Sequence, residues 1–182
     1  MTELTPRERV MRVFRKEPVD TLPFFSGYGM VVKPAITKLG YRFPQIHTDI
    51  NQMVQSAIES SRMFDFDSVA VPFDMTCESQ ALGNEISLYE DSEDILYPTI
   101  PDKIWKGLDE VEIPDNILEL GRMPMILEAI KLAKKEAPEY AIGAWQLGPF
   151  TMAGQLLELG IMLKGVFKQK ELVEAALVKS VT

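Results

Sequence analysis

Three short apolar runs, separated by long helical patterns, restrict the fold of this chain more than any other feature. They lie at residues 22–25, 68–73 and 140–145, and none alternates enough between apolar and polar residues to have one wet face. Strands that are covered on both faces are typical of parallel sheets, whose crossover connections are helices. The order strand, helix, strand, helix therefore predicts parallel βαβ units in an α/β sheet or barrel.

Helical periodicity fills most of the sequence between these runs. Thr5, Pro6 and Glu8 form the capping pattern of a helix over about residues 6–16. Apolar residues recur at helical spacing after Asp49, which predicts a helix from residue 50 onward. Further helices are expected over residues 123–133, 151–163 and 170–181. Residues 84–120 lack this periodicity, and we interpret them as an excursion from the core.

Composition narrows the class of protein. The net charge of −8 argues against a surface that follows phosphates, so we do not expect nucleic acid as a partner. No stretch approaches the ~20 apolar residues that cross a bilayer, and the charged N-terminus does not resemble a signal peptide. The single cysteine, Cys77, excludes an internal disulfide. These features predict a cytoplasmic protein that does not bind membranes.

Polar or glycine residues follow each apolar run, at the strand ends where parallel α/β folds carry their chemistry. Asp74 is the best catalytic candidate, because its carboxylate follows a buried strand and is expected in a partly desolvated pocket. Alternatively, Asp74 only turns the chain. Glu78 either shares that pocket or faces solvent. The other loop residues are candidates for substrate binding: Ser26, Gly27, Tyr28 and Gln146.

Histidine and cysteine often bind metals or act in catalysis, but His47 and Cys77 are predicted to have structural roles. His47 is the only histidine, stands at a helix start, and has no second histidine or cysteine at ligand spacing, so we expect no metal on this chain. Cys77 lies among acidic residues that disfavour its thiolate, so we predict a small buried side chain rather than a nucleophile.

Several motifs together resemble the uroporphyrinogen decarboxylase superfamily, and in detail its methylcobamide methyltransferases. They are residues 5–9, residues 17–23, the stretch VPFDMT at 71–76 that leads to QALG at 80–83, and GPFT at 148–151. The resemblance covers essentially the whole chain. It implies a (β/α)8 TIM barrel, of which residues 1–182 form the N-terminal half as part of one domain.

The resemblance also separates two branches of the superfamily. Asp74 occupies the place of the catalytic aspartate of the decarboxylase. The arginine-containing loop that binds the decarboxylase substrate is replaced by residues 25–30, and Gln155 stands in place of a tyrosine. A substrate with many carboxylates needs cationic partners, so these departures disfavour porphyrinogen decarboxylation and leave Gln155 as a substrate-binding candidate.

The methyltransferase branch implies transfer of a methyl group from a methylated corrinoid protein to coenzyme M or another acceptor, such as tetrahydrofolate. Methylcobamide is then supplied by the partner protein. The resemblance places the zinc ligands in the missing C-terminal half, so no zinc is expected on this chain. We expect the chain to be inactive alone and to form a homo-oligomer through open strand edges. A decarboxylase-like enzyme for another substrate and a non-catalytic split module are the alternatives.

Overall fold

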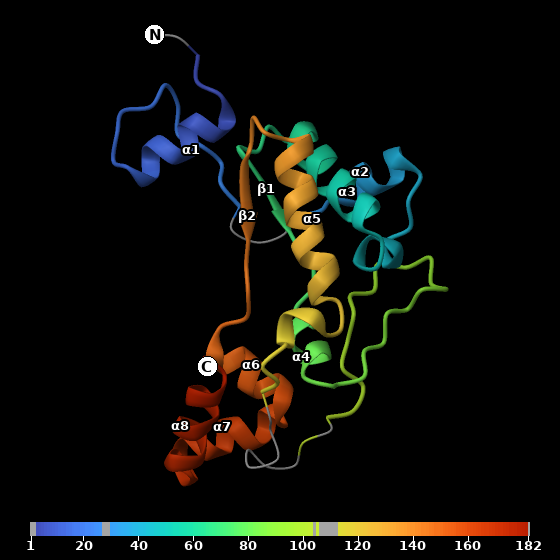
Figure 1. Ribbon diagram of the computed structural model, residues 1–182, viewed down its shortest axis with the longest axis vertical. Helices are drawn as coiled ribbons and strands as arrows, with labels where there is room; N and C mark the ends of the chain where they lie inside the picture. The colour runs from blue at the N-terminus through green and yellow to red at the C-terminus, as the bar shows by residue number, and fades with distance from the viewer. Residues whose placement is uncertain (1–2, 27–29, 104, 106–112, 182) are drawn as a thin grey trace. The chain divides into compact units, whose positions relative to one another are not determined.

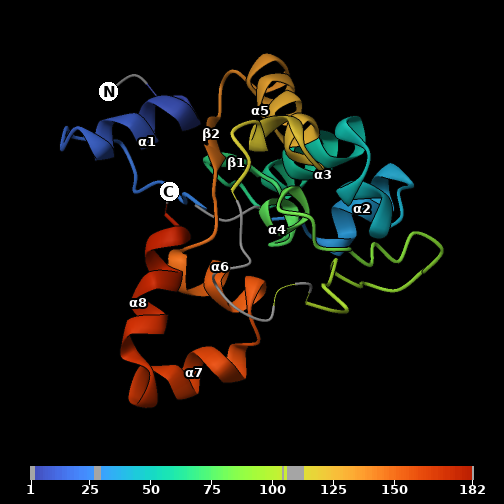
Figure 2. The ribbon, with the colours of Figure 1, turned by 60° about the horizontal axis from the view of Figure 1, so that its bottom comes forward.

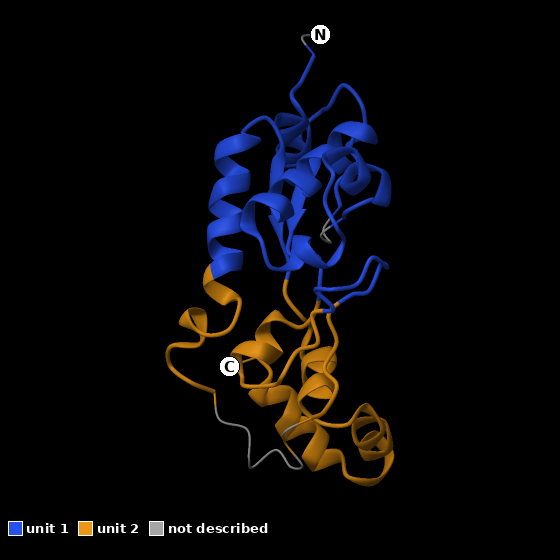
Figure 3. Cartoon of the chain, turned by 90° about the vertical axis from the view of Figure 1, so that its right-hand side faces the viewer, with its two compact units in different colours: residues 1–74, 89–97, 125–145 blue, residues 75–88, 98–124, 146–182 orange. Residues whose placement is uncertain are grey.

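The computed structural model describes residues 3–26, 30–103, 105 and 113–181 (Figure 1). It divides the chain into two compact units (Figure 3). Unit 1 comprises residues 1–74, 89–97 and 125–145, and unit 2 comprises residues 75–88, 98–124 and 146–182.

Each unit has its own set of secondary-structure elements. Those of unit 1 are α1 (Pro6–Phe14), α2 (Lys33–Leu39), η1 (Pro44–His47), α3 (Ile50–Met63), β1 (Ser68–Val71), most of α5 (Met123–Glu136) and β2 (Ala141–Ala144). Those of unit 2 are α4 (Cys77–Ala81), η3 (Ile117–Glu119), α6 (Pro149–Leu156), α7 (Leu159–Lys168) and α8 (Lys170–Lys179). The sequence analysis did not anticipate α2 or α4.

The sheet of unit 1 is a parallel pair. Ser68 of β1 lies opposite Ala141 of β2, and the register continues to Val71 opposite Ala144. Figures 1 and 2 show α3 and α5 on one side of the pair and α1 on the other. Helix α5 precedes β2 in the connection between the two strands. The predicted parallel α/β organisation is therefore confirmed.

Helix α3 supplies much of the core of unit 1. Its N-cap, Asp49, accepts a hydrogen bond from the Gln52 amide at 2.8 Å, as the sequence predicted. The predicted apolar face is buried, with Met53 and Val54 fully inaccessible and Ile58 2 % exposed. Burial of each large apolar side chain contributes about 1.5–3 kcal/mol, so this face anchors the helix to β1.

Helix α1 begins as predicted and ends two residues early. The Thr5 hydroxyl accepts from the Glu8 amide at 3.2 Å, and the Glu8 carboxylate accepts from the Thr5 amide at 2.9 Å. The helix ends at Phe14, and Lys16 has a left-handed backbone with φ of 60°. A left-handed residue cannot continue a right-handed helix.

A partly buried ion-pair network joins α1 to the residue before β1. Arg9 bonds the Asp20 carboxylate at 2.8 Å and the Asp67 carboxylate, while the Phe24 amide donates to Asp67 at 2.7 Å. Side chains of Arg9 and Asp67 are only 12 % and 9 % exposed. The Arg9 hydrogen bond, followed by that from the Leu4 amide, holds the pKa of the Asp20 carboxyl well below its usual range.

The prediction of a first strand over residues 22–25 is wrong. This segment is extended but forms no strand, and Leu22 and Phe24 are 85 % and 53 % exposed. Pro23 has no amide hydrogen to donate to a ladder. The Phe24 amide instead donates to the Asp67 side chain, and the Phe24 carbonyl accepts from the Asp67 amide at 2.9 Å.

The two observed strands differ in how far they are buried. All four residues of β1 are buried, as predicted. In β2 only Ala141 is buried, and Ala144 is exposed. Within the residues that the structure describes, β2 pairs with β1 alone, and the burial of both faces of residues 140–145 that their apolar character suggests is not observed in this chain.

The helix predicted over residues 151–163 is two helices. Leu157 and Glu158 have extended backbones, which separate α6 from α7 at a bend of 115°. The break allows Leu157 to pack, 1 % exposed, in a cluster with Met162 and Val173. Helical periodicity continues through the break, so the sequence pattern did not reveal it.

A partly buried tryptophan links the irregular segment of unit 2 to its helices. Trp105 packs against the cluster of Leu157 and Met162 and against a second cluster formed by Met152 and Leu156. One antiparallel bridge, between Ser87 and Thr99, joins two parts of the segment that was interpreted as an excursion. Part of the excursion therefore contributes to the packing of unit 2.

Membrane-spanning potential is limited in the described part of the chain. No single helix there is long and apolar enough to cross a membrane, whereas the bent pair of α6 and α7 meets the length and composition criteria when taken together.

Candidate functional site

A buried histidine and a buried aspartate meet in unit 1. His47 is fully inaccessible and Asp74 is 3 % exposed. The His47 Nδ1 atom lies 3.3 Å from the Asp74 Oδ2 atom. Both residues have further interactions within the chain. A carboxylate and an imidazole at this distance can share a proton and fix one another's orientation.

Aromatic rings surround the imidazole of His47. The ring centroid of Phe43 lies 5.1 Å away, that of Tyr97 5.8 Å away, and that of Phe73 6.3 Å away. Phe43 and Phe73 are themselves buried. Such rings exclude water, and the resulting low dielectric strengthens a polar contact.

The backbone at both ends of this pair is held in place. His47 ends η1, and the amides of Thr48 and Asp49 both donate to the Gln45 carbonyl, at 3.1 and 3.0 Å. On the other side, the Trp145 indole donates to the Pro72 carbonyl at 2.9 Å, two residues before Asp74. The carboxylate therefore leaves β1 from a chain segment that is tied to the end of β2.

Two of the predicted site residues come together in unit 2. Glu78 on α4 accepts a hydrogen bond from the Leu147 amide at 3.3 Å. Glu78 and Gln146 line a cavity of about 240 Å³, which also contacts Lys179 and Ser180 at the end of α8. A carboxylate, an amide and a cation on an otherwise apolar cavity are the usual elements of a small-molecule site.

Gln155 is not among the residues of that cavity. Its side-chain oxygen accepts a hydrogen bond from the Ser79 hydroxyl, and its carbonyl accepts from the Lys103 ammonium group at 2.9 Å. Lys103 also bonds the Gly154 carbonyl at 2.7 Å, and burial lowers the pKa of this lysine. In this structure, Gln155 joins α6 to α4 and to the irregular segment.

The predicted first-loop residues are only partly described. The Ser26 amide donates to the Ser68 hydroxyl at 2.8 Å, which returns a hydrogen bond to the Ser26 carbonyl at 3.3 Å. Ser26 thus lies beside the start of β1. Gly27 and Tyr28 lie outside the described residues, and their substrate-binding role stays a prediction.

Sequence reasoning missed two buried polar residues. His47 was assigned a helix-start role, and no local pattern signals its contact with Asp74, 27 positions later. Arg122, 7 % exposed, donates to Gln80 at 2.8 Å and to the Thr76 hydroxyl at 2.7 Å. No local pattern signals the burial of Arg122, because Gln80 and Thr76 lie 42 and 46 positions earlier in the chain. Cys77, in contrast, is buried as predicted.

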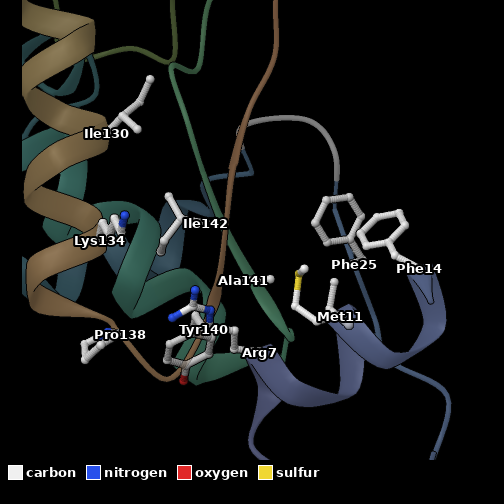
Figure 4. A pocket seen from close by; sticks show the side chains of 11 residues that line it. Arg7, Met11, Phe14, Phe25, Ile130, Lys134, Pro138, Tyr140, Ala141 and Ile142 are labelled. Atoms are coloured by element: carbon white, nitrogen blue, oxygen red, sulfur yellow. The ribbon is translucent and has the colours of Figure 1, made fainter. Parts of the chain in front are cut away.

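A second cavity, of about 350 Å³, lies in unit 1 among α1, α5 and β2 (Figure 4). Phe14 and Phe25 meet edge to face at one end, with ring centroids 5.6 Å apart, and Lys134 lies towards the other. This cavity borders Tyr140 and the first residues of β2. Ligands of parallel α/β proteins bind at the carboxyl ends of the strands, so we do not assign the site to this cavity.

Among the residues that the structure describes, no three histidine, cysteine or acidic side chains gather into a metal-binding group. The zinc implied by the family resemblance therefore finds no ligand set on the described part of the chain.

Comparison with known proteins supports the predicted resemblance. The family model of uroporphyrinogen decarboxylase (URO-D) matches residues 5–182. The chain is 29% identical over 178 residues to the methylcobamide:CoM methyltransferase MtaA of Methanosarcina barkeri strain Fusaro, and 31% identical over 179 residues to MtbA of Methanosarcina acetivorans. In each case the match covers 97% of this chain and 52% of the relative.

A solved structure gives the same result. A methyltransferase from Methanosarcina mazei superposes with a TM-score of 0.86 at 27% identity, over 98% of this chain and 52% of that one. The chain thus spans about half the length of the proteins that it matches.

Proposed function

The chain belongs to the uroporphyrinogen decarboxylase family, and from this premise we propose that it is part of a cobamide-dependent methyltransferase. The reaction would move a methyl group from a methylated corrinoid protein to coenzyme M or another acceptor such as tetrahydrofolate. The observation that carries the proposal is the likeness, in sequence and in structure, of nearly the whole chain to methyltransferases.

The fold of the working enzyme is part of the proposal. We infer that the parallel β1–β2 pair and its helices form one portion of a TIM barrel, which other polypeptide completes. The support is the parallel register of the two strands, together with the 52% coverage of the matching methyltransferase. In such a barrel the loops after the strands share one opening, and those of this chain carry Asp74 and Gln146.

The described residues suit a supporting role at such a site. Asp74 would hold or accept a proton, or orient the acceptor, since its carboxylate is desolvated and fixed by His47. Glu78 and Gln146 would contact a small molecule in the cavity that they line. Methylcobamide would come with the corrinoid partner, and zinc from residues outside this chain.

The proposal is tested by reconstitution. The chain would be co-expressed with the half of Methanosarcina barkeri MtaA that it does not match, and the complex assayed for methyl transfer from methylcobalamin to coenzyme M. We expect coenzyme M thiol to be consumed only when both polypeptides are present. Parallel assays with tetrahydrofolate identify the acceptor. A stable complex that transfers no methyl group to either acceptor would contradict the proposal.

We also propose that the chain self-associates when it is alone. In the described residues β2 pairs only with β1, and Ala144 at its end is exposed. An unpaired parallel edge is a template for association. Sedimentation equilibrium at micromolar concentration is expected to give a dimer or larger species, and a monomer mass with a cooperative thermal transition would contradict this expectation.

A further inference from the structure

We propose that His47 is the positioning residue of Asp74, with its Nδ1 atom protonated and donating to the carboxylate. The contact itself is independent of the reaction. Only its consequence for catalysis depends on the proposed methyltransferase function.

The Nδ1 and Oδ2 atoms lie within hydrogen-bonding distance but are not aligned for a hydrogen bond in this structure, and a small rotation of the imidazole would form it. An imidazole nitrogen that faces an ionised carboxylate oxygen must carry the proton, because both atoms otherwise present lone pairs. Here the atom that faces Asp74 Oδ2 is Nδ1, at 3.3 Å. Both side chains are at least 99 % inaccessible, so water does not replace this contact.

The surroundings make the orientation rigid. His47 is wedged among Phe43, Phe73 and Tyr97, and its backbone is fixed by the turn that closes on the Gln45 carbonyl. Packing against these three rings restricts rotation of the imidazole and keeps its Nδ1 atom on the side of the carboxylate. A carboxylate held in this way loses little conformational freedom when a substrate binds, which is how a buried neighbour assists a reacting group.

The proposal gives the two residues different roles. Asp74 is the candidate for contact with the reacting molecules, and His47 acts through Asp74. Loss of the imidazole would leave the carboxylate without this orienting donor but would not remove the carboxylate.

The test uses the fact that the chain contains a single histidine. The full chain would be produced with ¹⁵N-labelled histidine, so that two-bond proton–nitrogen spectra report the protonation of both ring nitrogens of His47 alone. We expect a protonated Nδ1 atom. In Asp74→Asn, the spectrum should shift towards the Nε2–H tautomer that free imidazole prefers.

A matched control changes charge without changing the contact. Asp49→Asn removes one carboxylate two residues from His47, and asparagine is an equally good N-cap for α3. This variant should leave the spectrum of His47 unchanged. An unprotonated Nδ1 in the wild-type chain would overturn the proposal, even if Asp74→Asn failed to fold. A folded Asp74→Asn chain with an unchanged spectrum would do the same.

A kinetic measurement separates positioning from structural support. In the reconstituted methyl-transfer assay, His47→Gln is expected to lower kcat by roughly 10-fold or more, as for other partners that orient a functional group, with KM for the acceptor unchanged. His47→Asn, which retains a donor near the Nδ1 position, should recover part of the loss. Equal kcat values for wild type and both variants would refute the positioning role. Absence of activity in the wild type would contradict the proposed function, while the spectra still decide the contact.

Discussion

Asp67→Ala is expected to lower the free energy of unfolding of unit 1 by about 1–3 kcal/mol. The substitution removes one of the two carboxylates that pair with Arg9, whose side chain is 12 % exposed, and leaves the Asp20 carboxylate in place. It also removes the acceptor of the Phe24 amide. Removing one partner costs more than the hydrogen bond itself contributes, because a partly buried donor that loses its acceptor keeps its desolvation cost.

The two tryptophans of the chain allow this loss to be assigned to one unit. Trp145 belongs to unit 1 and Trp105 to unit 2, so a Trp105→Phe background leaves Trp145 as the only indole reporter. Urea unfolding would then be followed by Trp145 fluorescence. Asp91→Ala, which removes an exposed carboxylate, is the control and should change stability by less than about 0.5 kcal/mol. A loss below about 1 kcal/mol for Asp67→Ala would show that the network is not a major support.

Asp74→Asn is expected to reduce kcat/KM of the reconstituted enzyme by about 10²–10⁴-fold, the range of a lost general acid or base. The physical reason is that its carboxylate is desolvated and held by a buried imidazole. Glu78→Gln should have a smaller effect. Its side chain is partly exposed, and glutamine retains an oxygen that can accept from the Leu147 amide.

The comparison of these two variants is informative because both make the same isosteric change from acid to amide. Steady-state rates at saturating acceptor give kcat, and the dependence on acceptor concentration gives KM. Circular dichroism of each variant shows whether it remains folded. Equal reductions in kcat/KM, or none in either variant, would remove the special role assigned to Asp74.

The helices show which structural features a local sequence pattern can predict. The start of α1 and the start of α3 were predicted correctly, because a capping residue and its partner lie within three positions in the chain. The break between α6 and α7 was missed, because it depends on burial of Leu157 against Met162 and Val173, and neither Leu157 nor Glu158 is a residue type that breaks a helix.

Of the apolar runs, one was correctly predicted as a buried strand and another was not. The apolar character of residues 68–73 was sufficient to predict a buried strand, and β1 is fully buried. Residues 22–25 have a similar character, yet Pro23 has no amide hydrogen to donate to a ladder, and the Phe24 amide donates to the Asp67 side chain instead. Composition alone did not distinguish these two cases.

The sequence by itself determined the class of fold, the parallel order of its two strands, the helix caps and the family, because each depends on periodicity or on motifs of neighbouring residues. Only the tertiary structure decided which polar groups meet. His47 reaches Asp74 across 27 positions, Arg9 reaches Asp67 across 58, and Ser79 reaches Gln155 across 76. Contacts of that separation arise from the packing of helices on strands, and a single sequence carries no local signal for them.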